Sequence, residues 1–486
     1  MLVSTVTSKL WIEPTADQVN IFTQFTLPRL GSFILAGLAN RRSGWDARVF
    51  VEGRKRFDLQ SWIAERGRPE VVGISTITAT AKRGYALADE CRSRGIPVLL
   101  GGPHVTFLPD EALSHAGLVV RGEGEAAMNA LLDLWSEGYV EATDARYAAI
   151  PNLSWKNTAG VIQHNGMAPW NTDLDALPVP DFSLAEGTAD CLVGGKRTVM
   201  VQTSRGCPFD FSFCSVAGMF GKKFQYRSVG SVLEELRRYD TRDHFVFFSD
   251  DNFTANKGRA RDLVEAMFAN KFRFRWSTQV RVDVARDSDL VQLMRRAGCH
   301  TVFIGFESVN PKSLIEMKKG QNLEEIRNAI RVVQAAGIHI HGMFVFGFDG
   351  DDWDTVEATV CFAREMKLTS VQLLILTPLP GSELYHHLRA EQRITSFDWD
   401  LYDTHHVVYR PAGFTPFELQ CAQVYGHTRL YALPQGPKKL ATGRLVSAGL
   451  SFYGMENQPG LAERQSTISS RASRQFSPRR RCWQLE

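Results

Sequence analysis

The sequence predicts an α/β protein with two successive open parallel sheets and a small C-terminal extension. At 486 residues the chain is about three times the usual domain length, so we expect two or three domains with buried cores. Short apolar strands alternate with helical segments, which is the pattern of parallel βα units. Glycines and polar residues follow these strands, where parallel sheets bind their ligands.

Composition and charge exclude several classes of protein. Hydrophobic residues make up 44% and charged residues 22%, as in ordinary globular proteins, and a net charge of +3 does not call for nucleic acid as a partner. The 8 cysteines are scattered and form no disulfide framework, and no basic-then-apolar leader opens the chain, so we expect a reducing, cytoplasmic location. No apolar run approaches about 18 residues, so we expect no transmembrane segment.

Residues 1–140 form the first predicted domain. Its strands are expected at 47–52 ("ARVFVE"), 71–76 ("VVGIST"), 97–102 ("PVLLGG") and 117–125 ("GLVVRGEGE"). Ligands of such a sheet bind at the carboxyl ends of its strands. The residues at those ends are Ser75, Thr76, Thr78, Gly101, Gly102, His104, Arg121 and Glu123. The glycines would let a bulky ligand approach the backbone, although each one alone is better explained by a tight turn between strand and helix.

Residues 141–195 contain "LDALPVPDF" and little periodicity, so we expect a linker there. The βα pattern then resumes over 196–390. Amphipathic helices separate six predicted strands, and six parallel units fit a partial or open barrel. These strands are "VMVQTS" (199–204), "FVFFSD" (245–250), "RWSTQV" (275–280), "TVFIGF" (301–306), "HGMFVFG" (341–347) and "SVQLLIL" (370–376).

Polar side chains at the carboxyl ends of the six strands predict one ligand-binding rim. Carboxylates pair with an ammonium group or ribose hydroxyls, and arginine pairs with a carboxylate, so the rim suits a zwitterionic ligand that carries ribose. The alternative is that Asp250 and Asp251 only cap the next helix and that Glu307 pairs with a nearby lysine. The rim residues are Asp250, Asp251, Gln279, Arg281 and Glu307, beside the loop that begins at Thr203.

The C-terminal part has a different composition. Residues 391–455 form an extension whose aromatic segment, "FDWDLYDTHHVVYRP" (397–411), is expected to cover the barrel mouth or support a substrate pocket. Residues 456–486 are rich in Ser, Gln and Arg, cannot bury a core, and are expected to be disordered.

Ten short motifs, in this order and spacing, resemble one enzyme family. The first domain contains "GGPHVTFLPDEAL" (101–113) and "VVRGEGE" (119–125). The second contains "TSRGCPFDFSFCS" (203–215), "FQYRS" (224–228), "FFSDDNF" (247–253), "TQVRVDVARD" (278–287), "TVFIGFESVN" (301–310), "KKGQN" (318–322), "GMFVFGFDGD" (342–351) and "LTPLPGSELY" (376–385). The chain resembles radical S-adenosylmethionine (radical SAM) enzymes that have an N-terminal cobalamin-binding domain.

The resemblance implies a Rossmann-like cobalamin-binding domain followed by a partial (β/α)6 radical SAM barrel. It also implies three cofactors: cobalamin, S-adenosylmethionine and a 4Fe-4S cluster. S-adenosylmethionine would lie near Asp250, Asp251, Gln279, Arg281 and Glu307, and cobalamin near residues 75–104. The chain lacks the Asp-x-His-x-x-Gly motif, so no protein histidine is expected as an axial cobalt ligand, and His104 is not assigned that role.

The cluster loop departs from the family pattern. The family sequence is Cys-x3-Cys-x2-Cys, because three thiolates hold three irons and the fourth iron binds S-adenosylmethionine. Cys207 and Cys214 match the first and third positions, but Phe211 stands at the second and has no lone pair for iron. Asp210 would be a poor substitute. Natural loss of radical initiation, an engineered or erroneous Cys→Phe change, and an outside ligand remain three explanations.

The family resemblance implies a cobalamin-dependent methyltransferase acting on an unactivated carbon or phosphorus centre of a small molecule, with activity impaired by Phe211. It also implies an external electron donor such as flavodoxin or ferredoxin. The alternatives are a non-catalytic protein that binds cobalamin and S-adenosylmethionine, and an oxidative cyclase. A nucleic-acid-modifying enzyme would rest on the basic tail alone.

Overall fold

The computed structural model describes residues 7–13, 29–53, 55–136, 138–171, 173–187, 192–193, 196–209 and 211–431. Residues 432–455 of the predicted extension, the tail 456–486 and Asp210 lie outside these residues, as do two of the 8 cysteines, Cys191 and Cys482. The predictions made for the tail and for Asp210 stay predictions. The chain divides into two compact units. The first contains residues 1–251, 378–387 and 397–403, and the second contains 252–377, 388–396 and 404–486.

The first unit contains an eight-stranded sheet with the order β7-β6-β5-β4-β3-β1-β2-β8. Its strands are β1 (Thr7–Glu13), β2 (Trp45–Val51), β3 (Val71–Ser75), β4 (Val98–Gly101), β5 (Leu118–Val120), β6 (Leu153–Lys156), β7 (Ile162–His164) and β8 (Ala185–Gly187). The four predicted strands are β2 to β5. Ser75 is the register partner of Gly101, so the carboxyl ends of β3 and β4 lie level.

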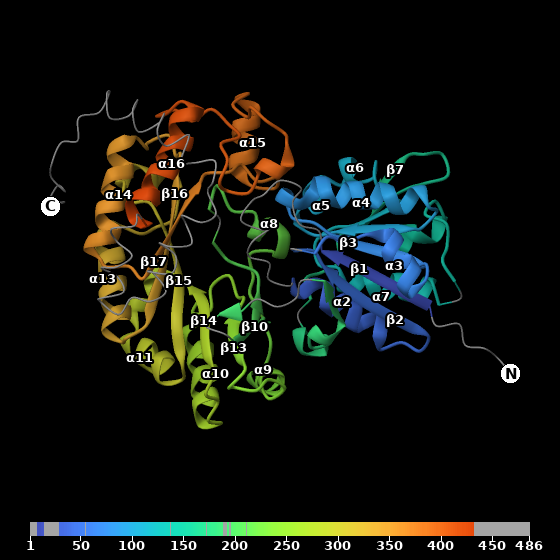
Figure 1. The fold of residues 1–486 in the computed structure, drawn as a ribbon, viewed down its shortest axis with the longest axis horizontal. Helices are drawn as coiled ribbons and strands as arrows, with labels where there is room; N and C mark the ends of the chain where they lie inside the picture. Colours follow the sequence, from blue (N-terminus) through green and yellow to red (C-terminus); the bar gives the residue numbers. More distant parts are fainter. Residues whose placement is uncertain are drawn as a thin grey trace. The chain divides into compact units, whose positions relative to one another are not determined.

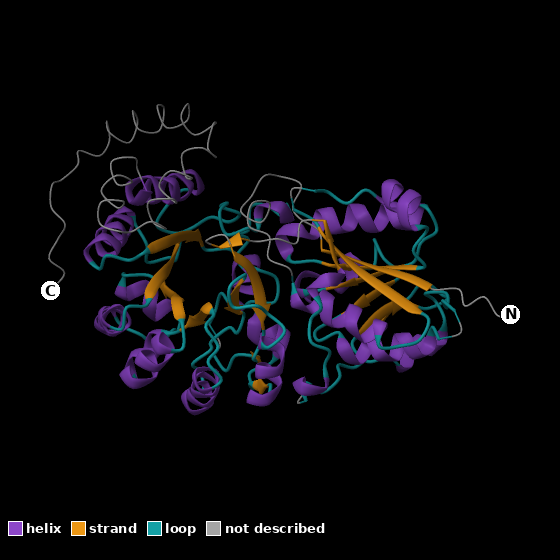
Figure 2. Ribbon diagram, turned by 60° about the horizontal axis from the view of Figure 1, so that its bottom comes forward, coloured by secondary structure: helices purple, strands orange, loops and turns teal. Residues whose placement is uncertain are grey.

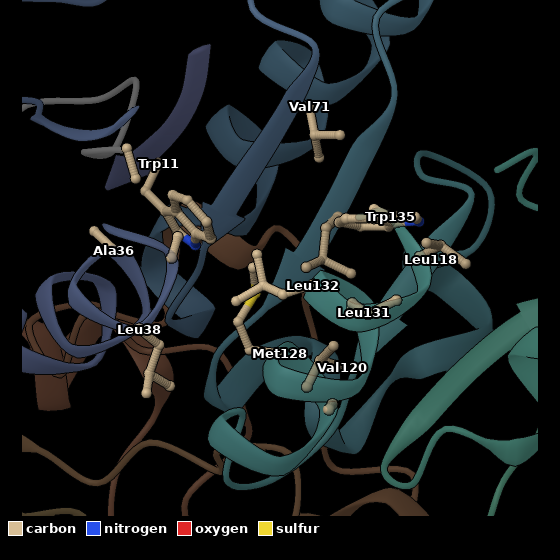
Figure 3. Close-up of a cluster of buried hydrophobic side chains, with 14 of the residues drawn as sticks. Trp11, Ala36, Leu38, Val71, Leu118, Val120, Met128, Leu131, Leu132 and Trp135 are labelled. Carbon is tan, nitrogen blue, oxygen red and sulfur yellow. The ribbon is translucent and has the colours of Figure 1, made fainter. Parts of the chain in front are cut away.

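Helices cover both faces of this sheet. They are α2 (Leu30–Asn40), α3 (Leu59–Arg66), α4 (Ala81–Ser93), α5 (Pro103–Phe107), α6 (Pro109–Ala112) and α7 (Glu125–Leu134), with short 3-10 turns η1 (Thr78–Thr80), η2 (Ala145–Ala149), η3 (Leu174–Ala176) and η4 (Phe182–Leu184). Helices α4 to α6 lie on one face, and α2 and α7 on the other (Figure 1). Trp11, Met128, Leu132 and Trp135 meet in the buried cluster between the sheet and α7 (Figure 3).

Residues 141–195 differ from the linker that the sequence predicts. Strands β6 and β7 extend the sheet as an antiparallel hairpin beside β5, and β8 pairs in parallel with β2. Each of these strands is only 3 or 4 residues long, and β7 and β8 have no buried residue. Such strands have no periodicity to detect, because neighbouring strands rather than local sequence determine where they form.

The second sheet has seven strands in the order β17-β16-β15-β14-β13-β10-β9. They are β9 (Leu192–Val193), β10 (Lys196–Val201), β13 (His244–Phe248), β14 (Arg275–Val280), β15 (Cys299–Glu307), β16 (His339–Phe346) and β17 (Ser370–Ile375). Strand β10 pairs in parallel with β13, and β14 to β17 pair in parallel in sequence order. The sheet curls with helices along its outer side, which confirms the partial barrel (Figure 2).

The remaining elements are helices of the barrel region, one small ribbon and the C-terminal extension. They are β11 (Ser204–Arg205), α8 (Val216–Phe220), β12 (Gln225–Tyr226), α9 (Val229–Leu236), α10 (Lys257–Ala269), η5 (Val282–Arg286), α11 (Ser288–Arg296), α12 (Pro311–Glu316), α13 (Leu323–Ala335), α14 (Trp353–Glu365), α15 (Glu383–Ala390), η6 (Trp399–Leu401) and α16 (Pro416–Tyr431). Side-chain caps begin several helices: Asn322, for example, forms a capping box with Glu325 at α13. Among the described residues, no helix combines the length and apolar character needed to cross a membrane.

The aromatic segment 397–411 packs mainly into the protein. Trp399, Tyr402 and Tyr409 are buried, and Trp399 Nε1 donates to Glu111 Oε1 at 2.8 Å. Phe397 is the exposed exception, at 53%. Three of the side chains on which the substrate-pocket interpretation rested therefore have structural partners, and they lend that interpretation no support.

Candidate functional site

Two glycines lie at the carboxyl end of β4, next to the carboxyl end of β3, and we call this group the glycine cradle (Ser75, Thr76, Gly101, Gly102). Gly102 has φ +102°, and a Cβ there would lie 2.4 Å from Thr76 O, so this position requires glycine. Among the described residues, the nearest atom to a Cβ added at Gly101 is Val120 O at 4.0 Å, so a methyl group would fit there without a clash. Thr76 N donates to Gly101 O at 2.9 Å and fixes the two strand ends together.

The glycine cradle contains one polar atom that is left for a ligand. Thr76 Oγ1 is buried and has no hydrogen-bond partner among the described residues. A buried hydroxyl without a partner is costly, so a polar ligand atom would stabilise it. The backbone at Gly101, where a methyl group would not clash, and this hydroxyl fit a bulky, amide-rich group such as cobalamin. Thr78 is buried where η1 begins, directly after the cradle.

His104 lies next to the glycine cradle but is enclosed by protein. Its side chain is fully buried, its Nε2 lies 3.3 Å from Glu111 Oε1, and its ring contacts Trp399 edge-on at 5.0 Å. Burial alone would raise the pKa of Glu111, but the contacts with His104 and Trp399 outweigh it and lower that pKa. The other ring nitrogen, Nδ1, is buried and has no hydrogen-bond partner among the described residues, and the view that His104 is not a cobalt ligand stays a prediction.

Arg121 and Glu123 follow β5, as predicted, and have partners within the protein. The Arg121 guanidinium donates to Asn165 O, and burial lowers its pKa. Glu123 Oε2 accepts from Asn171 N at 2.9 Å. Whether either residue also binds a cofactor stays a prediction.

A buried group of charges links Glu123 to the cysteine loop. Arg205 Nη1 lies 3.1 Å from Glu123 Oε1, and Arg205 Nη2 lies 2.7 Å from Glu125 Oε1. The three side chains, which we call the charge bridge, are at most 9% exposed. Burial alone would lower the pKa of Arg205, but the two carboxylates outweigh burial and raise it. Arg205 is therefore a fixed cation inside the first unit.

The cysteine loop holds its two thiols beside an aromatic stack. Cys207 is 8% exposed and Cys214 is half-buried. The Phe211 ring stacks between Phe209 and Phe213, with centroids 5.7 and 6.0 Å away. Phe211 is thus part of a packed arrangement at the position where the family has its second cysteine.

The described residues do not supply the donor set of a three-cysteine cluster site. No group of three or more His, Cys, Asp or Glu side chains able to hold a metal ion occurs among them. Two thiols and a stacked phenylalanine do not fit a 4Fe-4S cluster that is held by three protein thiolates. We therefore derive no chemical step through a cluster in this chain.

Asp250 organises the start of the cysteine loop. It is fully buried, and its carboxylate accepts from Thr203 N at 2.9 Å and from the Thr203 and Ser204 hydroxyls at 2.8 Å each. It does not cap the next helix, because Asn256 caps α10. Asp251 reaches solvent, yet the protein around it and the charge of Asp250 raise its pKa to about 6.

The predicted rim residues of the second unit have partners of their own. Lys319 Nζ bonds to Glu307 and donates to Gly305 O at 2.6 Å, so the lysine-pairing alternative for Glu307 is the one observed. Arg281 Nη2 donates to Lys319 O at 3.1 Å. The backbone carbonyl of Gln279 accepts from Phe253 N at 3.0 Å, a contact that does not involve its side chain. Roles for these residues in binding S-adenosylmethionine stay predictions.

Several residues that organise the site carry no role in the sequence-based prediction. They are Thr106, Glu111, Glu125, Gln202, Arg205, Lys319 and Trp399. All of them except Gln202 and Trp399 lie in motifs on which the family resemblance rests, and that was the available signal. The pairing of Arg205 with Glu125 was not visible, because 80 positions of sequence separate them.

Two family models match this chain: the radical SAM superfamily over residues 201–363, and the B12 binding domain over residues 20–132. An uncharacterised methyltransferase of Pyrococcus horikoshii is 30% identical over 88% of this chain and 92% of its own length. Bacteriochlorophyllide d C-12(1)-methyltransferase of Chlorobaculum tepidum is 30% identical over 70% of each chain. An anaerobic magnesium-protoporphyrin IX monomethyl ester cyclase of Rubrivivax gelatinosus is 26% identical over 72% of this chain and 64% of its own length.

A solved structure shares the fold. The radical S-adenosylmethionine methyltransferase TsrM of Kitasatospora setae, solved with cobalamin and a 4Fe-4S cluster bound, superposes with a TM-score of 0.63 at 19% identity, over 79% of this chain and 75% of that one. The two matched domains are those that use S-adenosylmethionine with a 4Fe-4S cluster, and cobalamin. With this domain pair and 30% identity over nearly its whole length to a methyltransferase, the chain belongs to the family of cobalamin-dependent radical SAM enzymes.

Proposed function

We propose that this chain is a methyltransferase that transfers a methyl group from cobalamin to an unactivated carbon of a small molecule. The observation that carries the proposal is the similarity over nearly the whole chain to enzymes named as methyltransferases. A carbon acceptor is favoured over phosphorus because the bacteriochlorophyllide relative is named for a carbon position.

The glycine cradle would hold cobalamin, with the Gly101 backbone and the Thr76 hydroxyl beside it. Asp250, Asp251, Gln279, Arg281 and Glu307 are proposed to bind S-adenosylmethionine. In the scheme that the family resemblance implies, a 4Fe-4S cluster would supply the electron for cleavage of S-adenosylmethionine, and flavodoxin or ferredoxin would reduce that cluster. Phe211 removes one of the three thiolates of that cluster, so we expect the chain as it stands to be impaired in cleavage.

Phe211 specifically favours a second candidate, a cofactor-binding protein without redox chemistry. The ordered stack of Phe209, Phe211 and Phe213 supports it, because the aromatic rings are packed at the position of the missing ligand. A cyclase is a third candidate, supported by the Rubrivivax relative at lower identity.

One comparison tests the proposal. The chain and its Phe211→Cys variant are reconstituted with iron and sulfide without oxygen, and deoxyadenosine formation is measured with a chemical reductant. Activity in the variant alone supports an impaired enzyme. Activity in neither, with both still binding methylcobalamin, supports the cofactor-binding protein. Failure of both to bind methylcobalamin and S-adenosylmethionine contradicts the two candidates together.

A further inference from the structure

The charge bridge connects the two parts of the first unit that the family motifs assign to different cofactors. Arg205 lies in the motif that contains the cysteines, whereas Glu123 and Glu125 lie in the first domain. All three side chains are nearly inaccessible, and the Arg205 Nε is also fixed by Gln202 Oε1 at 2.8 Å. A guanidinium held on three sides has no freedom to change partners.

On the side of the cysteine loop, Arg205 lies two residues before Cys207. Its neighbour Ser204 is fixed by Asp250, which accepts from the Ser204 hydroxyl at 2.8 Å. Gly206, between Arg205 and Cys207, has φ +86°, and a Cβ there would lie 2.3 Å from Lys223 O. This tight turn fixes the backbone between the two residues, so the position of Arg205 determines the position of Cys207.

On the side of the first domain, a short series of hydrogen bonds leads from Glu123 to the glycine cradle. Gly122 N, next to Glu123, donates to Thr106 Oγ1 at 2.9 Å. Thr106 Oγ1 donates to Gly102 O at 2.9 Å. The loop after β5 and the glycine cradle are thereby held in one arrangement.

We propose that Arg205 is a positioning residue that couples the cysteine loop to the glycine cradle, so that a corrinoid bound at the cradle stabilises residues 203–209. The inference rests on the proposed function, because it requires cobalamin at the cradle. The bridge contains two carboxylates and one guanidinium. Without Arg205, two buried negative charges would lose their shared cation, and the loop would lose its attachment to the first domain.

Hydrogen–deuterium exchange of the full chain, with and without methylcobalamin in the dark, tests the coupling without relying on activity. Coupling between two sites is commonly about 5- to 150-fold. In the unaltered chain we expect methylcobalamin to slow exchange in peptides containing residues 203–209 at least fivefold, while Arg205→Gln still binds methylcobalamin but shows no such slowing. Arg83→Gln is the matched control, since it removes a guanidinium that pairs with the buried Glu52 at 2.7 Å in the same unit. It should keep the slowing.

Glu125→Gln provides a second test if Arg205→Gln does not fold. It leaves one guanidinium and one carboxylate, and it should reduce the slowing at least twofold. The inference is overturned if methylcobalamin slows exchange of residues 203–209 in folded Arg205→Gln as much as in the parent chain. If only Glu125→Gln folds, the same result in that variant overturns it. So does binding of methylcobalamin that leaves exchange of residues 203–209 unaltered in the parent chain. If the parent does not bind methylcobalamin at all, the proposed function fails and this inference fails with it.

Discussion

Substitution of the two cradle glycines separates the cost to the fold from the cost to ligand binding. Gly102→Ala forces a side chain into a positive φ, which costs about 1–3 kcal/mol. The added Cβ would lie 2.4 Å from Thr76 O, a backbone atom that cannot rotate away, so we expect the upper end of that range. At about 2–4 °C per kcal/mol for a domain of this size, the Tm of the first unit should fall by about 6–12 °C.

Gly101→Ala is the matched control at the adjacent position. Gly101 has no positive φ, and its added Cβ would have no described neighbour closer than 4.0 Å, so the Tm should change by about 1 °C or less. The methyl group would instead occupy the space proposed for cobalamin, and we expect the Kd for methylcobalamin to rise about tenfold or more.

Differential scanning fluorimetry and absorbance titration with methylcobalamin measure the two effects on the same samples. An unchanged Tm in Gly102→Ala would refute the strained geometry of the cradle. An unchanged Kd in Gly101→Ala, with the fold intact, would refute the cradle as the cobalamin site.

Three further changes have defined outcomes. Thr76→Val removes a buried hydroxyl that has no partner in the part of the chain the structure describes, so in urea unfolding it should stabilise the free protein by about 1 kcal/mol while weakening methylcobalamin binding about fivefold. A lower free energy of unfolding would contradict this. Trp399→Phe removes the 2.8 Å hydrogen bond to Glu111 and should lower the free energy of unfolding by about 1–2 kcal/mol. Because the two residues interact, the double variant with Glu111→Gln should lose less than the sum of the two single losses. Burial lowers the pKa of His341 from 6.5 to about 4, so between these pH values the folded state binds fewer protons than the unfolded state. The stability that this residue contributes is therefore complete above about pH 6.5 and is lost as the pH falls toward 4. Between pH 7 and pH 5 the loss should be about 2 kcal/mol, and His341→Gln should remove that part of the pH dependence.

The strands that carry the site could be predicted because each is a short run of β-branched and aromatic residues followed by polar ones. Strands β13 and β16 illustrate this, since "HFVFF" and "HIHGMFVF" admit few other interpretations in a βα series. Strand β1 and strands β6 to β8 were missed. Strands β6 to β8 are short, and their pairing depends on neighbours that local sequence does not specify.

The candidate site was predicted at the level of positions, but not of partners. Asp250 and Glu307 were placed at strand ends correctly, yet the sequence left open whether they bind a ligand or serve the protein. The structure gives each a protein partner: Thr203 and Ser204 for Asp250, and Lys319 for Glu307. The contact between Trp399 and Glu111 joins residues 288 positions apart, so only the folded chain could show it.

Iron and sulfide analysis of the anaerobically reconstituted chain, beside its Phe211→Cys variant, tests most directly whether Phe211 limits this family member. We predict about four irons and four sulfides per chain, with the absorbance of a 4Fe-4S cluster, in Phe211→Cys, and substantially less in the unaltered chain. Equal, full occupancy in both proteins would contradict the account, because two protein thiolates would then be enough to hold the cluster.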